Sequence, residues 1–338
     1  MLVPVVDSNR KPLMPTTPSR ARRLIKSKEA TYFFRKGIFC IRLNREPSDR
    51  QYQDVVLGID PGSKKEGYTV KSEAYTYLNI TADAKTDIKD KVEARRNARR
   101  ARRQRKTPCR KNKSNRARSK NYIPPSTKAR WDWKLSIIKV LRDIFPINHI
   151  IVEDICAISK QGKKKWNTSF SPLEVGKTYF YNAIKSLPNI TLHLYKGYDT
   201  YKLRNELGLK KSKNKLERSF EAHCVDSWVM SYYVVGGDNK PDNIQVMYIS
   251  PITLYRRQLH VFNPTKGNIR KNYGGSISLG FKRGSLVKHN KYGYCYVGGN
   301  SRGKVSIHNI EDGERLAQNI KVEDLKFITY NTWKYITK

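Results

Sequence analysis

The order of apolar and polar positions predicts a mixed α/β layer in the middle of the chain. Residues 54–63, DVVLGIDPGS, form an apolar run that ends in Asp60 and a Pro-Gly turn, and residues 66–80 supply one or two further strands that return as hairpins. Residues 147–155, INHIIVEDI, form another buried strand, which carries Glu153. Strands that alternate with helices around acids at strand ends are typical of an α/β fold.

Apolar residues near helical spacing predict helices at 131–145 and 171–185, with a strand between the later helices at 190–195. Residues 216–235 predict an amphipathic helix that places Ala222, Val225, Val229 and Tyr232 on one face. His223 and Asp226 lie about one turn apart on that helix and therefore share a face.

The two ends of the chain read as smaller, β-rich units. The first 50 residues predict a short strand, a turn at Asp7–Arg10, a basic helix capped by Thr17 or Ser19, and two strands around a turn at Gly37. From about residue 244 onward, short apolar runs alternate with Gly, Asn and Lys turns. This regular spacing predicts a small antiparallel barrel.

The charge of the chain narrows its partners. Lys and Arg number 68 against 29 Asp and Glu, so the formal net charge is +39. A neutral metabolic enzyme has no use for such an excess, whereas a polyanion neutralises it and releases counterions on binding. Because apolar residues make up only 38% of the chain, we expect nucleic acid to order parts of it.

The sequence also indicates a compartment. It has no run long enough to span a bilayer and no signal peptide, so we expect a soluble, unexported protein. The five cysteines are scattered and never form a C-x-x-C pair. This pattern argues against a disulfide framework and a structural zinc site, and it fits a reducing interior.

Residues 91–120 carry the strongest compositional signal, because fifteen of these thirty residues are Lys or Arg and only Glu93 is acidic. The first half, 91–106, lacks Gly and Pro and predicts a helix without an apolar stripe. A solvated tail is the ordinary interpretation of a charge run. Because this run lies between two core-like segments, we expect a nucleic-acid-binding helix that uses Arg95, Arg96, Arg99, Arg100, Arg102, Arg103 and Arg105.

Three acids can build a site for a hard divalent cation. Asp60 and Glu153 lie at strand ends, and Asp226 follows His223 by one helical turn. Such an acid taken singly is most often a cap or a solvated group, and a lone histidine is most often structural. Together, however, the carboxylates can hold Mg²⁺ against a phosphodiester while the imidazole accepts a proton.

Five ordered motifs resemble one known family. KPLMP near the amino terminus, GIDPGS with Asp60, the arginine-rich tract, IIVED with Glu153, and EAHCVDSW with His223 and Asp226 follow the layout of the transposon-encoded, RNA-guided IscB and IsrB proteins. The resemblance implies an α/β, RNase H-like RuvC nuclease core that is split in sequence. It also implies that Asp60, Glu153 and Asp226 hold Mg²⁺, as two ions for which Mn²⁺ can substitute, and that His223 is the general base.

The spacing of the motifs selects a branch of that family. IscB carries an HNH nuclease domain between its second and third RuvC segments, whereas only residues 154–222, 69 in all, separate Glu153 from His223 here. These residues contain a lone His193 and no cluster suited to an HNH site. The chain therefore resembles IsrB, the form without HNH.

The resemblance divides the chain into five parts. These are a PLMP-type N-terminal domain at 1–50, RuvC segment I at 51–88, an arginine-rich bridge helix at 89–120, RuvC segments II and III at 121–243, and a β-rich domain at 244–338 that interacts with the target-adjacent motif. In the last part, the candidates for reading that motif are Arg256, Arg257, Arg270, Lys282, Arg283 and Arg302.

The resemblance implies an RNA-guided nickase that binds a guide-carrying omega RNA, pairs it with double-stranded DNA beside a short motif, and nicks the displaced non-target strand. We expect a monomer in a 1:1 ribonucleoprotein, in the cytoplasm of a prokaryote and at the nucleoid when bound to DNA, with no membrane partner. Two alternatives stay open. One is an RNA-independent RuvC-like nuclease that acts on branched DNA as a homodimer, and the other is a non-catalytic RNA-binding protein.

Overall fold

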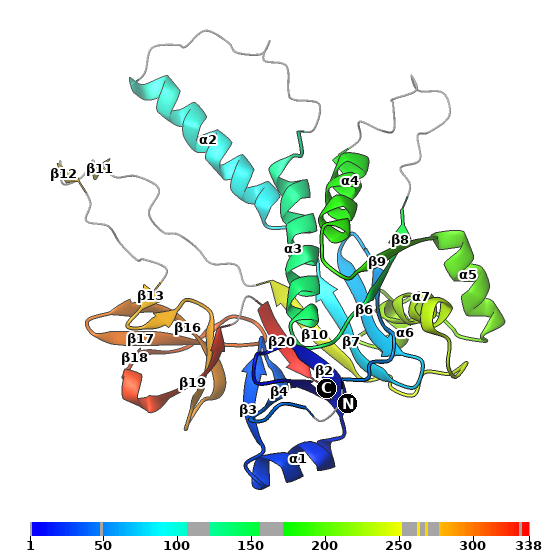
Figure 1. The fold of residues 1–338 in the computed structure, drawn as a ribbon. Coiled ribbons are helices and arrows are strands. Elements are labelled where there is room, and N and C mark those ends of the chain that lie inside the picture. Colours follow the sequence, from blue (N-terminus) through cyan, green and yellow to red (C-terminus); the bar gives the residue numbers. More distant parts are fainter. Residues whose placement is uncertain are drawn as a thin grey trace, which may run out of the picture.

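A central sheet of seven strands organises the molecule, which is a mixed α/β protein (Figure 1). The computed structural model describes residues 2–47, 50–106, 122–155, 172–251, 262–263, 268–269, 277–330 and 333–337. The strand order is β20-β10-β7-β6-β5-β8-β9. The strands are β5 (Val55–Asp60), β6 (Lys65–Ser72), β7 (Thr76–Asp83), β8 (His149–Asp154), β9 (Thr191–Lys196), β10 (Val246–Pro251) and β20 (Trp333–Thr337).

The central sheet joins an antiparallel half to a parallel half. β5, β6 and β7 form an antiparallel meander, as the sequence predicts. β8 pairs with β5 in parallel and β9 pairs with β8 in parallel, so their carboxyl ends share an edge of the sheet. β10 runs parallel to β7, and β20 closes the far side in antiparallel pairing with β10.

Helices cover both faces of the sheet. On one face, α3 (Pro125–Arg142) and α4 (Pro172–Lys185) pack on the largest apolar cluster, which includes Leu57, Ile59 and Val152. On the other face, α7 (Val225–Val235) contacts β5, β6 and β8, and α5 (Gly197–Glu206) packs beside it. Alternation along the strands therefore divides β5 and β8 between two helical layers.

The face under α3 contains a buried ion pair. Lys134 donates to Glu66 at 2.6 Å, and both side chains are at most 5% exposed. The Tyr68 hydroxyl donates to the other carboxylate oxygen of Glu66 at 2.6 Å. These bonds satisfy a charge that would be costly to bury alone, and they fix α3 against β6.

The helix expected at 216–235 is shorter and interrupted, and this prediction is wrong in two respects. Helix α6 spans only Phe220–His223, with Ser219 as its cap, and α7 begins after Cys224. Residues Val225–Ser231 are buried on all sides because the helix lies between the sheet and α5, so α7 is not amphipathic.

The amino-terminal part forms a separate four-stranded sheet with the order β2-β1-β4-β3. Its strands are β1 (Val3–Val6), β2 (Pro12–Thr16), β3 (Ala30–Arg35) and β4 (Ile38–Leu43), and α1 (Pro18–Lys26) packs on it. The Thr17 side chain accepts from the Arg20 amide at 3.3 Å, which confirms one of the two predicted caps. The predicted turn at Gly37 is also present, with Lys36 and Gly37 both at positive φ.

The arginine-rich helix predicted at 91–106 lies within α2 (Ile88–Lys106), and the rest of the tract, 107–120, lies outside the described residues. α2 contacts α3 and then extends away from the central layers (Figure 1). Among the described residues, no helix is both long and apolar enough to cross a membrane.

The carboxyl-terminal part contains a five-stranded antiparallel sheet with the order β18-β17-β16-β15-β19. Its strands are β15 (Ser285–His289), β16 (Gly293–Ser301), β17 (Lys304–Asn309), β18 (Arg315–Ile320) and β19 (Leu325–Tyr330), with a short helix, η2 (Val322–Asp324), before β19. The predicted barrel is wrong, since β18 and β19 do not pair among the described strands and the sheet stays open.

Two further pairs, β11 (Phe262–Asn263) with β12 (Asn268–Ile269) and β13 (Ile277–Ser278) with β14 (Phe281–Lys282), lie between β10 and β15 along the chain. The range 244–338, which the sequence assigns to one β-rich domain, also gives β10 and β20 to the central sheet. This non-local pairing ties the end of the chain to the central layer.

Candidate active site

Asp60 and Glu153 are brought together by the parallel pairing of β5 and β8. Ile59 is the register partner of Val152, so the next residues, Asp60 and Glu153, lie side by side at the carboxyl edge. Val56 and Ile151 pack with Met230 of α7. Because side chains alternate along a strand, Asp60 and Glu153 project to this same α7 face.

Two glycines let the third acid approach the sheet. A Cβ at Gly58 would lie 2.1 Å from the Ser227 carbonyl oxygen and 2.3 Å from Ser231 Oγ. A Cβ at Gly67 would lie 1.9 Å from the His223 carbonyl oxygen. Only glycine permits this spacing, which holds the first turn of α7, and with it Asp226, close against β5 and β6.

Two cations that sequence reasoning missed contact the acids. Lys211 forms ion pairs with Asp226 and, at 3.6 Å, with Asp60. Arg204 of α5 pairs with the other carboxylate oxygen of Asp226, whose side chain is 5% exposed. Lys211 belongs to a run of lysines in which nothing local distinguishes one from the next, and α5 lacks the apolar stripe that would have revealed it.

Burial and neighbouring negative charge raise the pKa values of Asp60 and Glu153. Burial raises the pKa of Asp60, and the negative charge of Asp226 raises it further, although the Lys211 ammonium opposes both effects. Burial, followed by the charge of Asp60, raises the pKa of Glu153 to about 8. The Glu153 carboxyl therefore carries a proton near neutral pH and donates it in a hydrogen bond to Asp60.

His223 lies in α6, directly before the turn that carries Asp226. Its side chain is buried, and among the described residues its Nε2 has no hydrogen-bond partner. Burial lowers the pKa of the imidazole, and the positive charges of Lys65 and Lys215 lower it further. His223 is therefore neutral near pH 7 and can accept a proton.

The chemistry of the donor set, rather than its spacing, suits a hard divalent cation. In the described part of the chain, no group of three or more His, Cys, Asp or Glu side chains is arranged so that it could hold a metal ion. However, the carboxylates of Asp60 and Asp226 already attract the Lys211 ammonium, and burial followed by the charge of Asp60 raises the pKa of Glu153 to about 8. Carboxylate oxygens of this kind are the protein ligands that Mg²⁺ prefers.

The other described candidate residues lie on elements that do not carry the three acids. Arg95, Arg96, Arg99 and Arg100 are exposed on α2, and Arg102, Arg103 and Arg105 continue the same helix. Lys282 is exposed on β14, Arg283 follows it and is half-buried, and Arg302 is exposed in the turn between β16 and β17. Arg256, Arg257 and Arg270 lie outside the described residues.

Comparisons with known proteins match parts of the chain. A family model described as RRXRR protein matches residues 3–163, a range that includes Arg99–Arg103 with the sequence R-R-A-R-R. No curated protein matches the chain at a significant level of similarity.

Two solved structures of a Thermus thermophilus protein are similar to about half of the chain. One is RuvC of T. thermophilus in complex with a Holliday junction substrate, with 15% identity, a TM-score of 0.30, and coverage of 54% of this chain and 97% of that chain. The other is Thermus thermophilus RuvC, with 15% identity, a TM-score of 0.26, and coverage of 54% and 96%.

We predict that Gly58→Ala separates α7 from β5. The added methyl group collides with the Ser227 backbone, so the free energy of unfolding should fall by about 1–3 kcal/mol. Urea unfolding measures this change. Gly299→Ala is the matched control, because among the described residues its Cβ would meet only Arg283 Nη2, at 3.5 Å. Equal stability of the two variants would show that the close approach at Gly58 does not exist.

We also predict a pH dependence that originates at Glu153. The native state keeps a proton that the unfolded state releases at its ordinary pKa of 4.5, so in the presence of a chelator stability falls as the pH rises from about 4.5 to about 8. Glu153→Gln should remove most of this fall, whereas replacing the exposed Glu311 with Gln should not. The urea midpoint as a function of pH provides the measurement, and an unchanged profile in Glu153→Gln would contradict the assignment.

Proposed function

We propose that the protein is an RNA-guided, Mg²⁺-dependent DNA endonuclease that nicks the displaced, non-target strand. The observation that carries the proposal is the meeting of Asp60, Glu153 and Asp226 on one face of the sheet, where Lys211 pairs with both Asp60 and Asp226. His223, whose buried Nε2 has no partner among the described residues, precedes Asp226 by three residues. Carboxylates that converge from separate elements suit phosphodiester hydrolysis. They have no comparable use in a protein that only binds RNA.

The acids and the histidine of the site have different roles in the proposed reaction. Asp60, Glu153 and Asp226 would hold the cation, which when bound supplies positive charge to the phosphate oxygens and the leaving oxygen. The Glu153 carboxyl gives up its proton when positive charge arrives, so cation binding should strengthen as the pH rises. His223, neutral near pH 7, accepts the proton of the attacking water through Nε2.

The exposed arginines of α2 support the proposal that the protein binds a guide RNA. Arg95, Arg96, Arg99 and Arg100 of α2 are exposed, and α2 extends away from the layers, so phosphates can reach this helix from more than one side (Figure 1). In RNA-guided recognition, base pairing reads the sequence while the protein holds the backbone by shape and charge. The omega RNA, the 1:1 stoichiometry, the bridge-helix role of 89–120 and the motif-reading role of 244–338 belong to this proposal.

The strand preference follows from having one set of carboxylates. A single site aligns one strand for in-line attack at a time. The guide-paired strand is held in an A-form heteroduplex, whereas the displaced strand is flexible enough to enter the site. Between Glu153 and His223, the described residues 172–222 contain α4, β9, α5 and most of α6, and His193 hydrogen-bonds to His149 at 3.2 Å. These elements offer no second nuclease centre in the described part of that interval.

The Arg helix gives one prediction. Replacing Arg95, Arg96, Arg99 and Arg100 with Gln should weaken RNA binding and reduce the slope of log affinity against log salt by roughly one unit for each phosphate that no longer pairs with an arginine. Fluorescence anisotropy over a salt series measures both. The matched control replaces four exposed basic residues of α1 with Gln, namely Arg20, Arg22, Arg23 and Lys26. An equal decrease of the slope in the control would remove any special role for α2.

The acids give a second prediction. With the RNA that co-purifies from the native operon and Mg²⁺, a target duplex labelled differently on each strand should be nicked only in the displaced strand. Asp60→Asn should lower the rate roughly a thousandfold or more, because several kcal/mol of charge stabilisation disappear, and it should leave target binding within about twofold.

Asp54→Asn is the control for this experiment, since Asp54 is 68% exposed at the opposite end of the same strand. Wild-type cutting by Asp60→Asn would exclude Asp60 from the site. Cutting of branched DNA without RNA would instead favour the RNA-independent nuclease, and cutting of the paired strand would reverse the proposed strand preference.

A further inference from the structure

A cavity of about 670 Å³ lies where the amino-terminal sheet meets the carboxyl-terminal sheet. Its walls come from β3, β19 and the end of α3, and they include Phe34, Arg35, Lys36, Phe327 and Tyr330. The volume lies within the range of about 300–1,000 Å³ that is typical of small-ligand sites.

The cavity is separate from the carboxylate site. Asp143 and Ile144 line it and precede β8, so they lie toward the amino end of that strand. Glu153 lies at the carboxyl end of the same strand. At about 3.3 Å per residue, the six residues of β8 set the two sites on opposite edges of the sheet.

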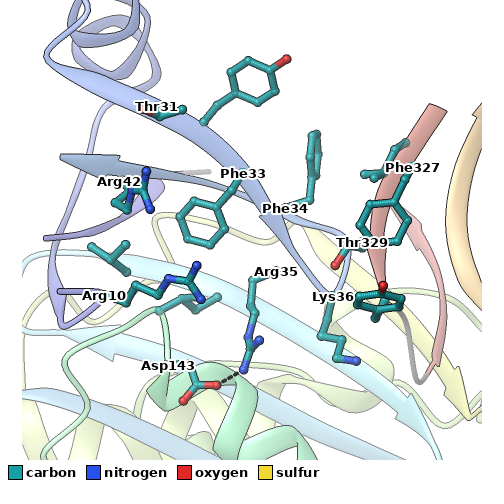
Figure 2. A pocket seen from close by; sticks show the side chains of 15 residues that line it. Arg10, Thr31, Phe33, Phe34, Arg35, Lys36, Arg42, Asp143, Phe327 and Thr329 are labelled. Atoms are coloured by element: carbon teal, nitrogen blue, oxygen red, sulfur yellow. Dashed lines mark hydrogen bonds and ion pairs between the residues drawn. The ribbon is translucent and has the colours of Figure 1, made fainter. Parts of the chain in front are cut away.

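Aromatic rings line both walls of the cavity and are unusually exposed. Phe327 and Tyr330 are 43% and 44% exposed, with ring centroids 4.7 Å apart, and Tyr32 on the facing wall is 53% exposed. Figure 2 shows the Phe34 and Phe327 rings on the same side of β3, with Phe33 on the other side among the arginines. Aromatic faces left open to solvent in a cavity suit a planar ligand that stacks.

Positive charge lines the cavity on both sides of β3. Arg10, Arg35 and Arg42 lie with Phe33 on the other side of the strand from the Phe34 and Phe327 rings, and Lys36 lines the cavity as well (Figure 2). The only acid among the described lining residues, Asp143, is already paired with Arg35. The Lys282 ammonium lies 4.9 Å from the centre of the Tyr330 ring. Burial lowers the pKa of Lys36, and the positive charges of Arg35 and Lys282 lower it further because like charges repel one another. An anion between them would relieve that repulsion.

We propose that this cavity, the nucleotide cavity, binds one unpaired nucleotide of an RNA strand, with its base stacked on Phe327 or Phe34 and its phosphate held by the surrounding cations. Rings and cations together are the combination that recognises single-stranded nucleic acid, since stacking needs a base that is out of its helix. The hydroxyl group of Tyr330, which is 44% exposed on the wall, offers a partner for a ribose 2′-OH, which favours RNA over DNA. The inference rests on the proposed function only for the RNA partner and uses none of the catalytic residues.

The test uses the full-length protein and a fluorescein-labelled 12-residue oligouridylate as the single-stranded probe. Phe327→Ala should weaken its binding at least about fivefold, as expected when one base no longer stacks, without changing the salt slope. Lys36→Gln should reduce the salt slope instead. Tyr294→Ala, in the same sheet and 53% exposed but outside the cavity, should bind as wild type does.

Three comparisons can overturn the proposal. For a fully paired RNA duplex of the same length, the affinities of wild type and Phe327→Ala should differ by less than about twofold. If Phe327→Ala weakens duplex binding as much as single-strand binding, stacking is contradicted. If oligothymidylate DNA binds the wild type more tightly than oligouridylate does, and Phe327→Ala weakens both equally, the occupant of the cavity is DNA and not RNA. Photo-crosslinking of a 4-thiouridine probe should label Tyr32, Phe34, Phe327 or Tyr330, and labels confined to other residues would exclude the cavity.

The outcome is independent of nuclease activity. Asp60→Asn should leave oligouridylate binding and its crosslinks unchanged, and Phe327→Ala should retain the circular dichroism spectrum of the wild type because its ring is 43% exposed. A protein without nuclease activity can therefore still satisfy the cavity test, and an active nuclease can still fail it.

Discussion

The mutual repulsion of Asp60, Glu153 and Asp226 is the interaction on which the rest of the site depends. Three carboxylates on one face of a sheet cannot all ionise unless positive charge compensates them. In this structure Lys211 and Arg204 pair with Asp226, and Lys211 also pairs with Asp60. The pKa of Glu153, raised to about 8 by burial and by the charge of Asp60, keeps that carboxyl largely neutral near pH 7. The negative charge of the site therefore attracts cations, and a divalent cation would neutralise it more completely than a single ammonium group.

Close packing of the helices on the sheet holds the three carboxylates near one another despite their repulsion. Gly58 and Gly67 bring α6 and α7 so close to the sheet that no side chain fits between them, and the parallel pairing of β5 with β8 fixes the first two acids side by side. On the opposite face, α3 and the Glu66–Lys134 pair hold the sheet from behind. The fold thus holds the acids in place before any ligand arrives, which is the condition for efficient electrostatic catalysis.

Local sequence patterns were sufficient for the parts of the site that depend on neighbours along the chain. Apolar runs that end in an acid revealed Asp60 and Glu153, and the composition of 91–106 revealed the helix. They were insufficient where contacts are non-local. Nothing near Lys211 or Arg204 shows that they meet Asp226, and strand spacing alone cannot say whether a sheet closes or whether β10 and β20 join another layer. The break at Cys224 was missed because the residues around it all have helical periodicity.

The central claim is that the three carboxylates form one divalent-cation site, and Mn²⁺ binding followed by electron paramagnetic resonance tests it most directly. Titrating Mn²⁺ into the full-length protein should show bound ion that Mg²⁺ displaces, with affinity that increases between about pH 6 and pH 8 as Glu153 loses its proton. Asp60→Asn and Glu153→Gln should each abolish most of this binding, and Asp54→Asn should not. Equal Mn²⁺ uptake by the wild type and by both site variants would contradict the account.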